Sequence, residues 1–307
     1  MTTALLFPGQ GSQRVGMGKE LAQAHAIAQQ TYDEADAVLG FSLSKLCFEG
    51  PEDELVLTKH TQPAILVTSI AVFRVLRDKG LAFDIVAGHS LGEWTALVAA
   101  GAIELADAVR LTHLRGTYMQ EAVPVGQGAM AALIGLDLDK TRALCEQASQ
   151  PGEPVEPANM NGAGQIVISG HVAAVDRAIE GSKAAGAKLA KKLPVSAPFH
   201  CSLMKPAADR LAAAMADLSI ATPCVPVVAN VTAEPTQDPA QIARLLVQQV
   251  TAPVRWEESV QAIAKLGITR ALELGSGAVL KGLVKRIAPT IETTTIGEPH
   301  EVAAFSA

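Results

Sequence analysis

Short apolar runs alternate with amphipathic stretches along most of this 307-residue chain. Residues 4–7 and 83–87 are apolar runs that end at Pro8-Gly9 and at Gly88, a pattern typical of buried strands that lead into loops. Apolar residues at helical spacing predict helices at residues 63–79, 91–100 and 105–121, the first two followed directly by a glycine. The first third of the chain therefore predicts buried strands connected by helices.

Residues 126–195 change character, because short strand patterns come close together there. The elements expected are strands at 129–136, 155–160, 165–169 and 187–195, with helices at 140–149 and 173–185. Asn161-Gly162-Ala163-Gly164 between the two middle strands is a favourable hairpin turn. The order strand-helix-strand-strand-helix-strand is the ferredoxin-like arrangement. We interpret residues 126–195 as a subdomain inserted into a larger domain.

The larger domain is expected to occupy residues 1–125 and 196–307. Its second part predicts helices at 203–217, 239–250, 256–266 and 279–287, and strands at 225–230, 270–274 and near Thr293. Strands that alternate with helices indicate a parallel sheet with both faces covered. The predicted fold class is α/β, a parallel-sheet domain with the inserted subdomain.

Composition and charge exclude several classes of protein. The chain is 49% hydrophobic and 18% charged, and its net charge of −6 argues against a nucleic-acid-binding protein. The longest apolar run, residues 96–103, is far shorter than the roughly 18 residues of a membrane helix. The start of the chain lacks the pattern of a secretory signal, and the cysteines are widely spaced with no CxxC pair. We therefore expect a cytoplasmic protein without disulfides.

Gly88-His89-Ser90-Leu91-Gly92 is a Gly-x-Ser-x-Gly pattern between an expected strand and an expected helix. Such a serine sits on a strained strand-to-helix turn, with the N–H groups of the helix start near any developing negative charge. A chance glycine-serine turn is the alternative. The flanking strand and helix favour a nucleophilic Ser90.

A nucleophilic serine needs a base, and His200 is the best placed of seven histidines. It follows a strand pattern and precedes a helix pattern, where a sheet places residues at its carboxyl edge. His89 adjoins Ser90, but neighbours across a sharp turn usually point apart, so we expect it to line the pocket or support it. No acidic residue is recognisable as a third triad member, which leaves a Ser-His dyad oriented by a backbone carbonyl. No metal-ligand spacing occurs among the histidines.

Arg115 lies inside the expected helix 105–121, with Leu111 and Met119 one turn away on either side. It could be an arginine that snorkels from a half-buried face, or a guanidinium that clamps a carboxylate bidentately. Gly9-Gln10-Gly11 follows the first strand, and its glycines would let the backbone approach a ligand while Gln10 supplies a donor. An ordinary glycine-rich loop is the alternative for this segment.

These motifs, in their order, resemble the malonyl-CoA:acyl-carrier-protein transacylase family, whose catalytic domain also occurs inside fatty-acid and polyketide synthases. The motifs are PheProGlyGlnGly at 7–11, GlyHisSerLeuGlyGlu at 88–93, Arg115, ProPheHis at 198–200, and Gln249 shortly before ProValArgTrp at 253–256. The likeness runs from Phe7 to about Ile287. Each motif alone is weak, whereas the ordered set is highly specific.

The resemblance implies an α/β-hydrolase-like large domain with a ferredoxin-like insertion. It also implies a role for each matched residue: Ser90 is acylated, His200 is its base, Arg115 binds the malonyl carboxylate, the N–H groups of Leu91 and Gln10 form the oxyanion hole, and the carbonyl of Gln249 orients His200. His89, Met119 and Phe199 would line the substrate pocket. Many stand-alone bacterial members carry serine at the position of Phe199, so this departure leaves open whether fatty-acid synthesis, polyketide synthesis or a malonate decarboxylase is served.

The implied substrates are malonyl-CoA and the phosphopantetheine arm of an acyl carrier protein, with no bound cofactor. Basic residues at Lys191, Lys192, Lys285 and Arg286 could receive an acidic carrier protein by electrostatic steering, although ordinary solvated charge is the alternative. We expect a monomer that binds neither nucleic acid nor membrane.

Two other functions stay open at this point. A serine hydrolase or thioesterase could use the same serine turn, but no triad acid is evident and Arg115 is suited to an acyl group that carries a carboxylate. A catalytically inactive acyl-binding or scaffold protein is the second, and the intact set of Ser90, His200 and Arg115 argues against it.

Overall fold

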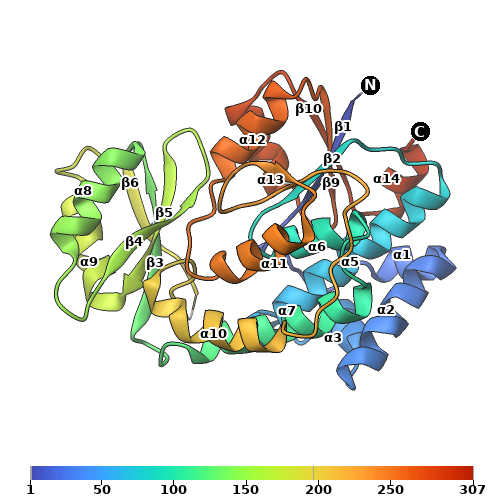
Figure 1. Ribbon diagram of the computed structural model, residues 1–307, viewed down its shortest axis with the longest axis horizontal. Coiled ribbons are helices and arrows are strands. Elements are labelled where there is room, and N and C mark those ends of the chain that lie inside the picture. Colours follow the sequence, from blue (N-terminus) through green and yellow to red (C-terminus); the bar gives the residue numbers. More distant parts are fainter. Residues whose placement is uncertain (1, 196, 307) are drawn as a thin grey trace.

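The structure is a computed structural model that describes residues 2–195 and 197–306. Ser196, where the larger domain is expected to resume, lies outside the described residues, as do the chain ends Met1 and Ala307. Two sheets organise the molecule: one carries most of the helices, and a smaller one stands to its side with α8 and α9 (Figure 1). No helix in the described ranges is long and apolar enough to span a bilayer.

The larger sheet has six strands in the order β10-β9-β1-β2-β7-β8. All neighbours in it are parallel except β7 and β8, which pair antiparallel. Its strands are β1 Thr3–Phe7, β2 Ile85–Gly88, β7 Val227–Val228, β8 Pro235–Thr236, β9 Arg270–Leu274 and β10 Glu292–Ile296. This parallel-rich α/β sheet confirms the predicted fold class.

Both faces of this sheet are covered, and β1 explains how. Every residue of β1 is buried, and alternate side chains enter different clusters: Leu5 and Phe7 on one face, Ala4 and Leu6 on the other. The second face packs against α12 Trp256–Lys265 and α13 Val279–Ile287. The first face carries α1 Lys19–Ala24, α2 Ala26–Leu39, α3 Leu43–Glu49, α4 Glu52–Leu55, α5 Thr58–Asp78, α6 Leu91–Ala99, α7 Leu105–Glu121, α10 Lys205–Ala214, α11 Pro239–Gln248 and α14 Pro299–Ala304.

The smaller sheet has four antiparallel strands in the order β4-β5-β3-β6. Its elements are β3 Gly128–Ile134, α8 Leu138–Ala148, β4 Val155–Met160, β5 Gln165–His171, α9 Val172–Ser182 and β6 Leu189–Lys192, followed by a 3-10 turn at Ser202–Met204. One face packs on α8 and α9, and Met130, Ala158 and Val167 on the other face join the core of the larger sheet. The sequence of elements is the predicted one, whereas domain limits at 126 and 195 stay a prediction.

Several predicted elements differ in extent; the strand expected at 187–195, for example, is limited to β6, and the helix expected at 203–217 to α10. The helix expected from residue 63 begins at Thr58, so that Pro63 lies inside α5. The backbone N–H groups of His60 and Thr61 donate to the Leu57 carbonyl, so the first turn of the helix forms before Pro63. Proline is often the first residue of a helix, so the sequence predicted that the helix starts at Pro63 and not at Thr58. The strand expected at 225–230 is reduced to β7, and Asn230 lies beyond its carboxyl end.

Candidate active site

Ser90 occupies a sharp turn between β2 and α6, with a positive φ of 52°. Left-handed backbone is unfavourable for a residue with a side chain, so the surroundings must hold it there. The two flanking glycines permit this: a Cβ on Gly88 would lie 1.9 Å from the Gly92 carbonyl carbon, and a Cβ on Gly92 would lie 2.0 Å from the Phe7 oxygen. The strained turn that the pattern predicts is present, and it exposes the Ser90 hydroxyl at the carboxyl edge of the sheet.

His200 lies beside this serine, on the segment that follows the smaller sheet. Its Nε2 is 2.7 Å from Ser90 Oγ, and its Nδ1 is 2.8 Å from the Gln249 carbonyl oxygen. Because a carbonyl can only accept, Nδ1 carries the proton and Nε2 is left to accept from the serine hydroxyl. Burial and then the positive charge of Arg115 lower the pKa of His200 from 6.5 to about 3, so the free site holds a neutral imidazole.

Arg115 projects from α7 to the other side of the serine, and its side chain is only 1% exposed. Nη1 donates to Gln62 Oε1 at 2.6 Å, while Nη2 donates to Gln249 Oε1 at 2.8 Å and to Ser90 Oγ at 3.1 Å. Its buried Nε has no hydrogen-bond partner among the described residues. Burial lowers the pKa of Arg115 to about 10, which still leaves it charged at neutral pH. The snorkelling alternative is wrong, since the guanidinium is buried.

A small cavity of about 130 Å³ brings these groups together. It is lined by Gln10, Gln62, His89, Ser90, Leu91, Arg115, Met119, Met130, Asn159, Leu193, Val195, Phe199 and His200. Most residues singled out from the sequence therefore surround one space, and Gln249 stands directly behind it through its contacts with His200 and Arg115. The space is suited to a short acyl group.

Leu91 and Gln10, the residues expected to supply oxyanion donors, line the same cavity as Ser90. Leu91 is the first residue of α6, where backbone N–H groups have no acceptor within the helix, and Gln10 follows β1 in the adjacent loop. The Gln10 side chain donates to Thr58 Oγ1 at 3.4 Å. His89 points away, with Nε2 2.9 Å from Asn161 Oδ1 and its ring against Trp256.

Sequence reasoning missed a buried polar network beneath the turn. Asn230 Oδ1 accepts from the Ser90 N–H at 2.7 Å, and its Nδ2 donates to the Gly88 carbonyl at 2.7 Å, which braces the strained backbone. Glu93, 3% exposed, accepts from the Asn230 N–H at 2.9 Å and from Gln249 Nε2 at 2.7 Å. A charged residue in an otherwise apolar helix start was the one signal available for Glu93.

A second hollow of about 240 Å³ adjoins the cavity and shares Gln10, His89, Asn159 and Leu193 with it. It runs between the smaller sheet and α13, whose residues Val279, Leu280 and Leu283 line it. This arrangement provides an approach to Ser90 from the surface.

The four basic residues considered for carrier docking do not share one surface. Lys191 lies opposite Ala132 of β3, which lines the second hollow, so the two side chains share that face. Lys192 is on the other face and pairs with Asp176 of α9 at 2.6 Å. Lys285 and Arg286 occupy the last turn of α13, and Arg286 donates to Gln165 Oε1 at 3.0 Å across the gap to β5.

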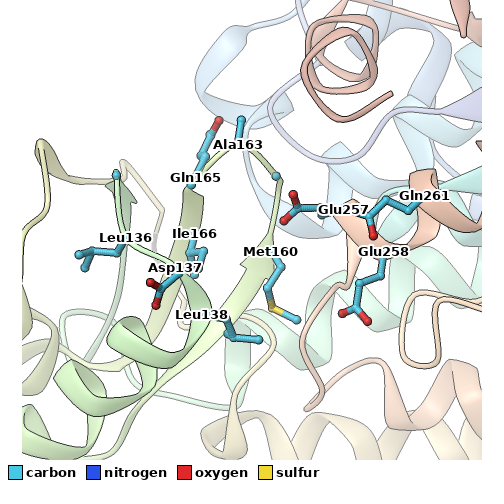
Figure 2. A pocket seen from close by; sticks show the side chains of 13 residues that line it. Leu136, Asp137, Leu138, Met160, Ala163, Gln165, Ile166, Glu257, Glu258 and Gln261 are labelled. Carbon is cyan, nitrogen blue, oxygen red and sulfur yellow. The ribbon is translucent and has the colours of Figure 1, made fainter. Parts of the chain in front are cut away.

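A larger hollow of about 700 Å³ lies elsewhere (Figure 2). Glu257, Glu258 and Gln261 of α12 face Met160 and Ile166 of the smaller sheet across it. Its lining includes neither Ser90, His200 nor Arg115, so it is separate from the cavity at the serine turn. Across residues 2–195 and 197–306, no group of three or more His, Cys, Asp or Glu side chains is placed to hold a metal ion.

Comparison with known proteins gives a consistent result. The sequence profile of the acyl transferase domain matches residues 4–293. The malonyl CoA-acyl carrier protein transacylase of Escherichia coli (strain K12) is 49% identical over 302 residues, covering 98% of this chain and 97% of the relative.

Solved structures agree with the sequence comparison. The acyl-carrier-protein-S-malonyltransferase from Bartonella henselae superposes with a TM-score of 0.96 at 47% identity, covering 99% of this chain and 98% of that one. A malonyl-transacylase in complex with its type II PKS acyl-carrier protein gives a TM-score of 0.96 at 46% identity, with coverage of 99% and 98%. Family profile, identity and fold together establish that this chain belongs to the malonyl-CoA:acyl-carrier-protein transacylase family of acyl transferases.

Proposed function

We propose that the protein transfers malonyl from malonyl-CoA to the phosphopantetheine thiol of an acyl carrier protein, through a malonyl ester on Ser90. The observation that carries this proposal is the position of Arg115, whose Nη2 lies 3.1 Å from the serine hydroxyl. A buried guanidinium with neutral acceptors is matched to an acyl group that ends in a carboxylate. The names of the relatives support the same substrates.

In the first half-reaction, His200 Nε2 takes the proton of Ser90 as Oγ attacks the thioester carbon of malonyl-CoA. The N–H groups of Leu91 and Gln10 would stabilise the oxyanion, each donor contributing about 2.7–4 kcal/mol. Collapse of the intermediate breaks the carbon–sulfur bond, and His200 returns the proton to the departing thiolate of coenzyme A.

In the second half-reaction, the phosphopantetheine thiol enters by the second hollow and gives its proton to His200. Its sulfur attacks the acyl-serine carbon, Ser90 leaves with the proton, and the malonyl group departs on the carrier protein. This sequence has ping-pong kinetics. Arg115 would hold the acyl chain in place during the exchange and help to exclude water.

Substrate binding would also activate the base. The charge of Arg115 is the second contribution, after burial, that lowers the pKa of His200. A malonyl carboxylate on Arg115 offsets that charge, so His200 becomes more basic when a carboxylated acyl group is in place. This coupling favours reaction with the substrate that Arg115 recognises.

Intact-mass analysis tests the proposal directly. The protein mixed with malonyl-CoA should gain one malonyl group and lose it on addition of carrier protein that bears phosphopantetheine. Rapid release of free malonate without any thiol acceptor would instead favour the hypothesis of a hydrolase or thioesterase. Absence of a malonyl adduct would favour the hypothesis of a catalytically inactive acyl-binding or scaffold protein.

The pH dependence of loading should reflect the buried imidazole. A lowered His200 pKa keeps the base neutral to lower pH, so the acid limb of kcat/KM for malonyl loading should fall below 6.5, the ordinary histidine value. Rapid-quench measurement of the Ser90 adduct between pH 5 and pH 8 checks this. A half-loss of rate near pH 6.5 would contradict a buried neutral base.

Carrier docking can be tested on the last turn of α13. Reversing charge with Lys285→Glu and Arg286→Glu should raise KM for the carrier protein about tenfold and leave malonyl-CoA loading unchanged, because steering acts on the acidic partner. Lys192 lies on the face of the smaller sheet that packs on α9, away from α13, so Lys192→Glu serves as the matched control. It should change neither KM for the carrier protein nor malonyl-CoA loading. Steady-state transfer assays at low and high salt make the comparison, and equal KM values for wild type and double variant would end the docking proposal.

The remaining expectations stay proposals. They are a monomeric, cytoplasmic protein without a bound cofactor, and division into a domain of residues 1–125 and 196–307 and an inserted subdomain of residues 126–195. Whether the product feeds fatty-acid synthesis, polyketide synthesis or a malonate decarboxylase depends on the carrier protein it meets.

A further inference from the structure

Glu93 is a buried carboxylate that the transfer mechanism does not use. It is the third residue of α6, and its side chain contacts no solvent-exposed cation: Oε2 accepts from the Asn230 N–H and from Gln249 Nε2. A carboxylate in such a place is costly unless its oxygens are satisfied and its charge is balanced.

The Gln249 side chain connects Glu93 to the pocket. Its Nε2 donates to Glu93 at 2.7 Å and to the Ser90 carbonyl at 3.0 Å, while its Oε1 accepts from Arg115 Nη2 at 2.8 Å. An amide nitrogen can only donate and an amide oxygen can only accept. Glu93 thus fixes which end of the amide faces Arg115, because the reversed amide would point donors at the guanidinium.

The charged groups of Arg115 and Glu93 lie on either side of this Gln249 amide. The hydrogen-bond acceptors of Arg115 among the described residues, Gln62, Gln249 and Ser90, are all neutral. In its ionised form Glu93 raises the pKa of Arg115 against the effect of burial. Burial raises the pKa of Glu93 itself to about 7, while the hydrogen bonds from Asn230 and Gln249 and the charge of Arg115 act to lower it. Burial lowers the pKa of His89 and of His200, the other titratable groups around the cavity.

We infer that Glu93 is a positioning residue for the transfer: it acts through the Gln249 amide to keep Arg115 charged and directed at Ser90, and so sets the preference for acyl groups that carry a carboxylate. The inference rests on the proposed function. A carboxylate in direct contact with Arg115 would compete with the substrate for the guanidinium. One held an amide away stabilises the cation and leaves its donors available.

Glu93→Gln removes the charge and keeps an oxygen that can accept from Asn230 and Gln249. Because hydrogen bonds to an ionised acceptor are about twice as strong as neutral ones, the amide and Arg115 are held less firmly in this variant. We expect kcat/KM for malonyl loading of Ser90 to fall about tenfold, mainly through KM, with acetyl loading changed less than about twofold. Loss of the Glu93 charge also lowers the pKa of Arg115, so the alkaline limb of malonyl loading should move to lower pH.

Two further variants make the test specific. Glu273→Gln neutralises another buried carboxylate, which accepts the N–H groups of Leu280 and Lys281 at the start of α13, and should leave the malonyl-to-acetyl ratio as in wild type. Gln249→Met removes the amide bridge, retains the backbone carbonyl that holds His200, and should reproduce the selective loss even where Glu93→Gln folds poorly.

Equal losses of malonyl and acetyl loading in both Glu93→Gln and Gln249→Met, or an alkaline limb that does not move, would overturn the inference. Failure of the proposed function would look different, because wild-type protein would then form no malonyl adduct at all. Thermal unfolding of each variant, followed alongside loading, separates a loss of fold from a loss of preference.

Discussion

Ser90→Ala should abolish the malonyl adduct, with the loading rate lowered about 10⁴-fold or more. The hydroxyl is the only group in the described cavity that is hydrogen-bonded to His200 Nε2, at 2.7 Å, so no other side chain there can take over the attack. Removal of a serine nucleophile in comparable enzymes costs several orders of magnitude, since base and oxyanion donors then have nothing to activate. Intact-mass and rapid-quench measurements with malonyl-CoA report the adduct.

A matched control is available in α12. Ser259 is buried, and its hydroxyl donates to the Arg255 carbonyl within its own helix, well outside the cavity lining. Ser259→Ala should load as wild type does. A malonyl adduct that persists in Ser90→Ala would place the nucleophile elsewhere and refute the assignment.

Arg115→Ala should lower malonyl loading about 10²- to 4 × 10³-fold and acetyl loading only a few-fold. Removing one partner of a buried charge pair costs about 3–5 kcal/mol, which corresponds to a loss of that size. An acetyl group has no carboxylate for the guanidinium, so its loading loses only the contact of Arg115 Nη2 with Ser90 Oγ and the effect of the Arg115 charge on His200. Competition between malonyl-CoA and acetyl-CoA, read by the mass of the adduct, measures the change in preference.

Two variants refine this experiment. Arg115→Lys keeps the charge without the planar set of donors and should fall between wild type and the alanine variant. Arg110→Ala, on the same helix, removes an exposed partner of Asp107 and should change neither loading rate. Equal losses of malonyl and acetyl loading in Arg115→Ala would show that the arginine supports the serine rather than the acyl chain.

The fold could be predicted largely from patterning because strands such as β1 and β2 are short and fully buried, and they end at Pro8-Gly9 and at Gly88. The helix at 105–121 and the strand at 270–274 have the predicted limits in the structure. The start of α5 could not be found, because its first turn is polar and is stabilised by contacts such as Thr61 Oγ1 to the Leu55 carbonyl. Such contacts depend on tertiary placement, which local sequence does not report.

The candidate site divides in the same way. Ser90 could be predicted because its neighbours impose a recognisable backbone, and Gly88 and Gly92 are needed at fixed positions. Asn230 and Gln62 could not, since an amide in a loop or on a helix has no distinctive pattern. Their importance arises only when segments 140 residues apart, such as Ser90 and Asn230, meet.

Ser90 and His200, the proposed catalytic pair, lie far apart in the sequence and are therefore made at different times during synthesis. Ser90 and His200 are 110 residues apart, and the whole smaller sheet is formed from the residues between them. During synthesis, the serine turn therefore leaves the ribosome well before His200, its proposed base, has been made. A nascent or truncated chain that ends before residue 200 would carry an unactivated serine and could not consume malonyl-CoA. The proposed reactivity of Ser90 therefore requires synthesis at least as far as His200, and as far as Gln249 for the carbonyl that holds its ring.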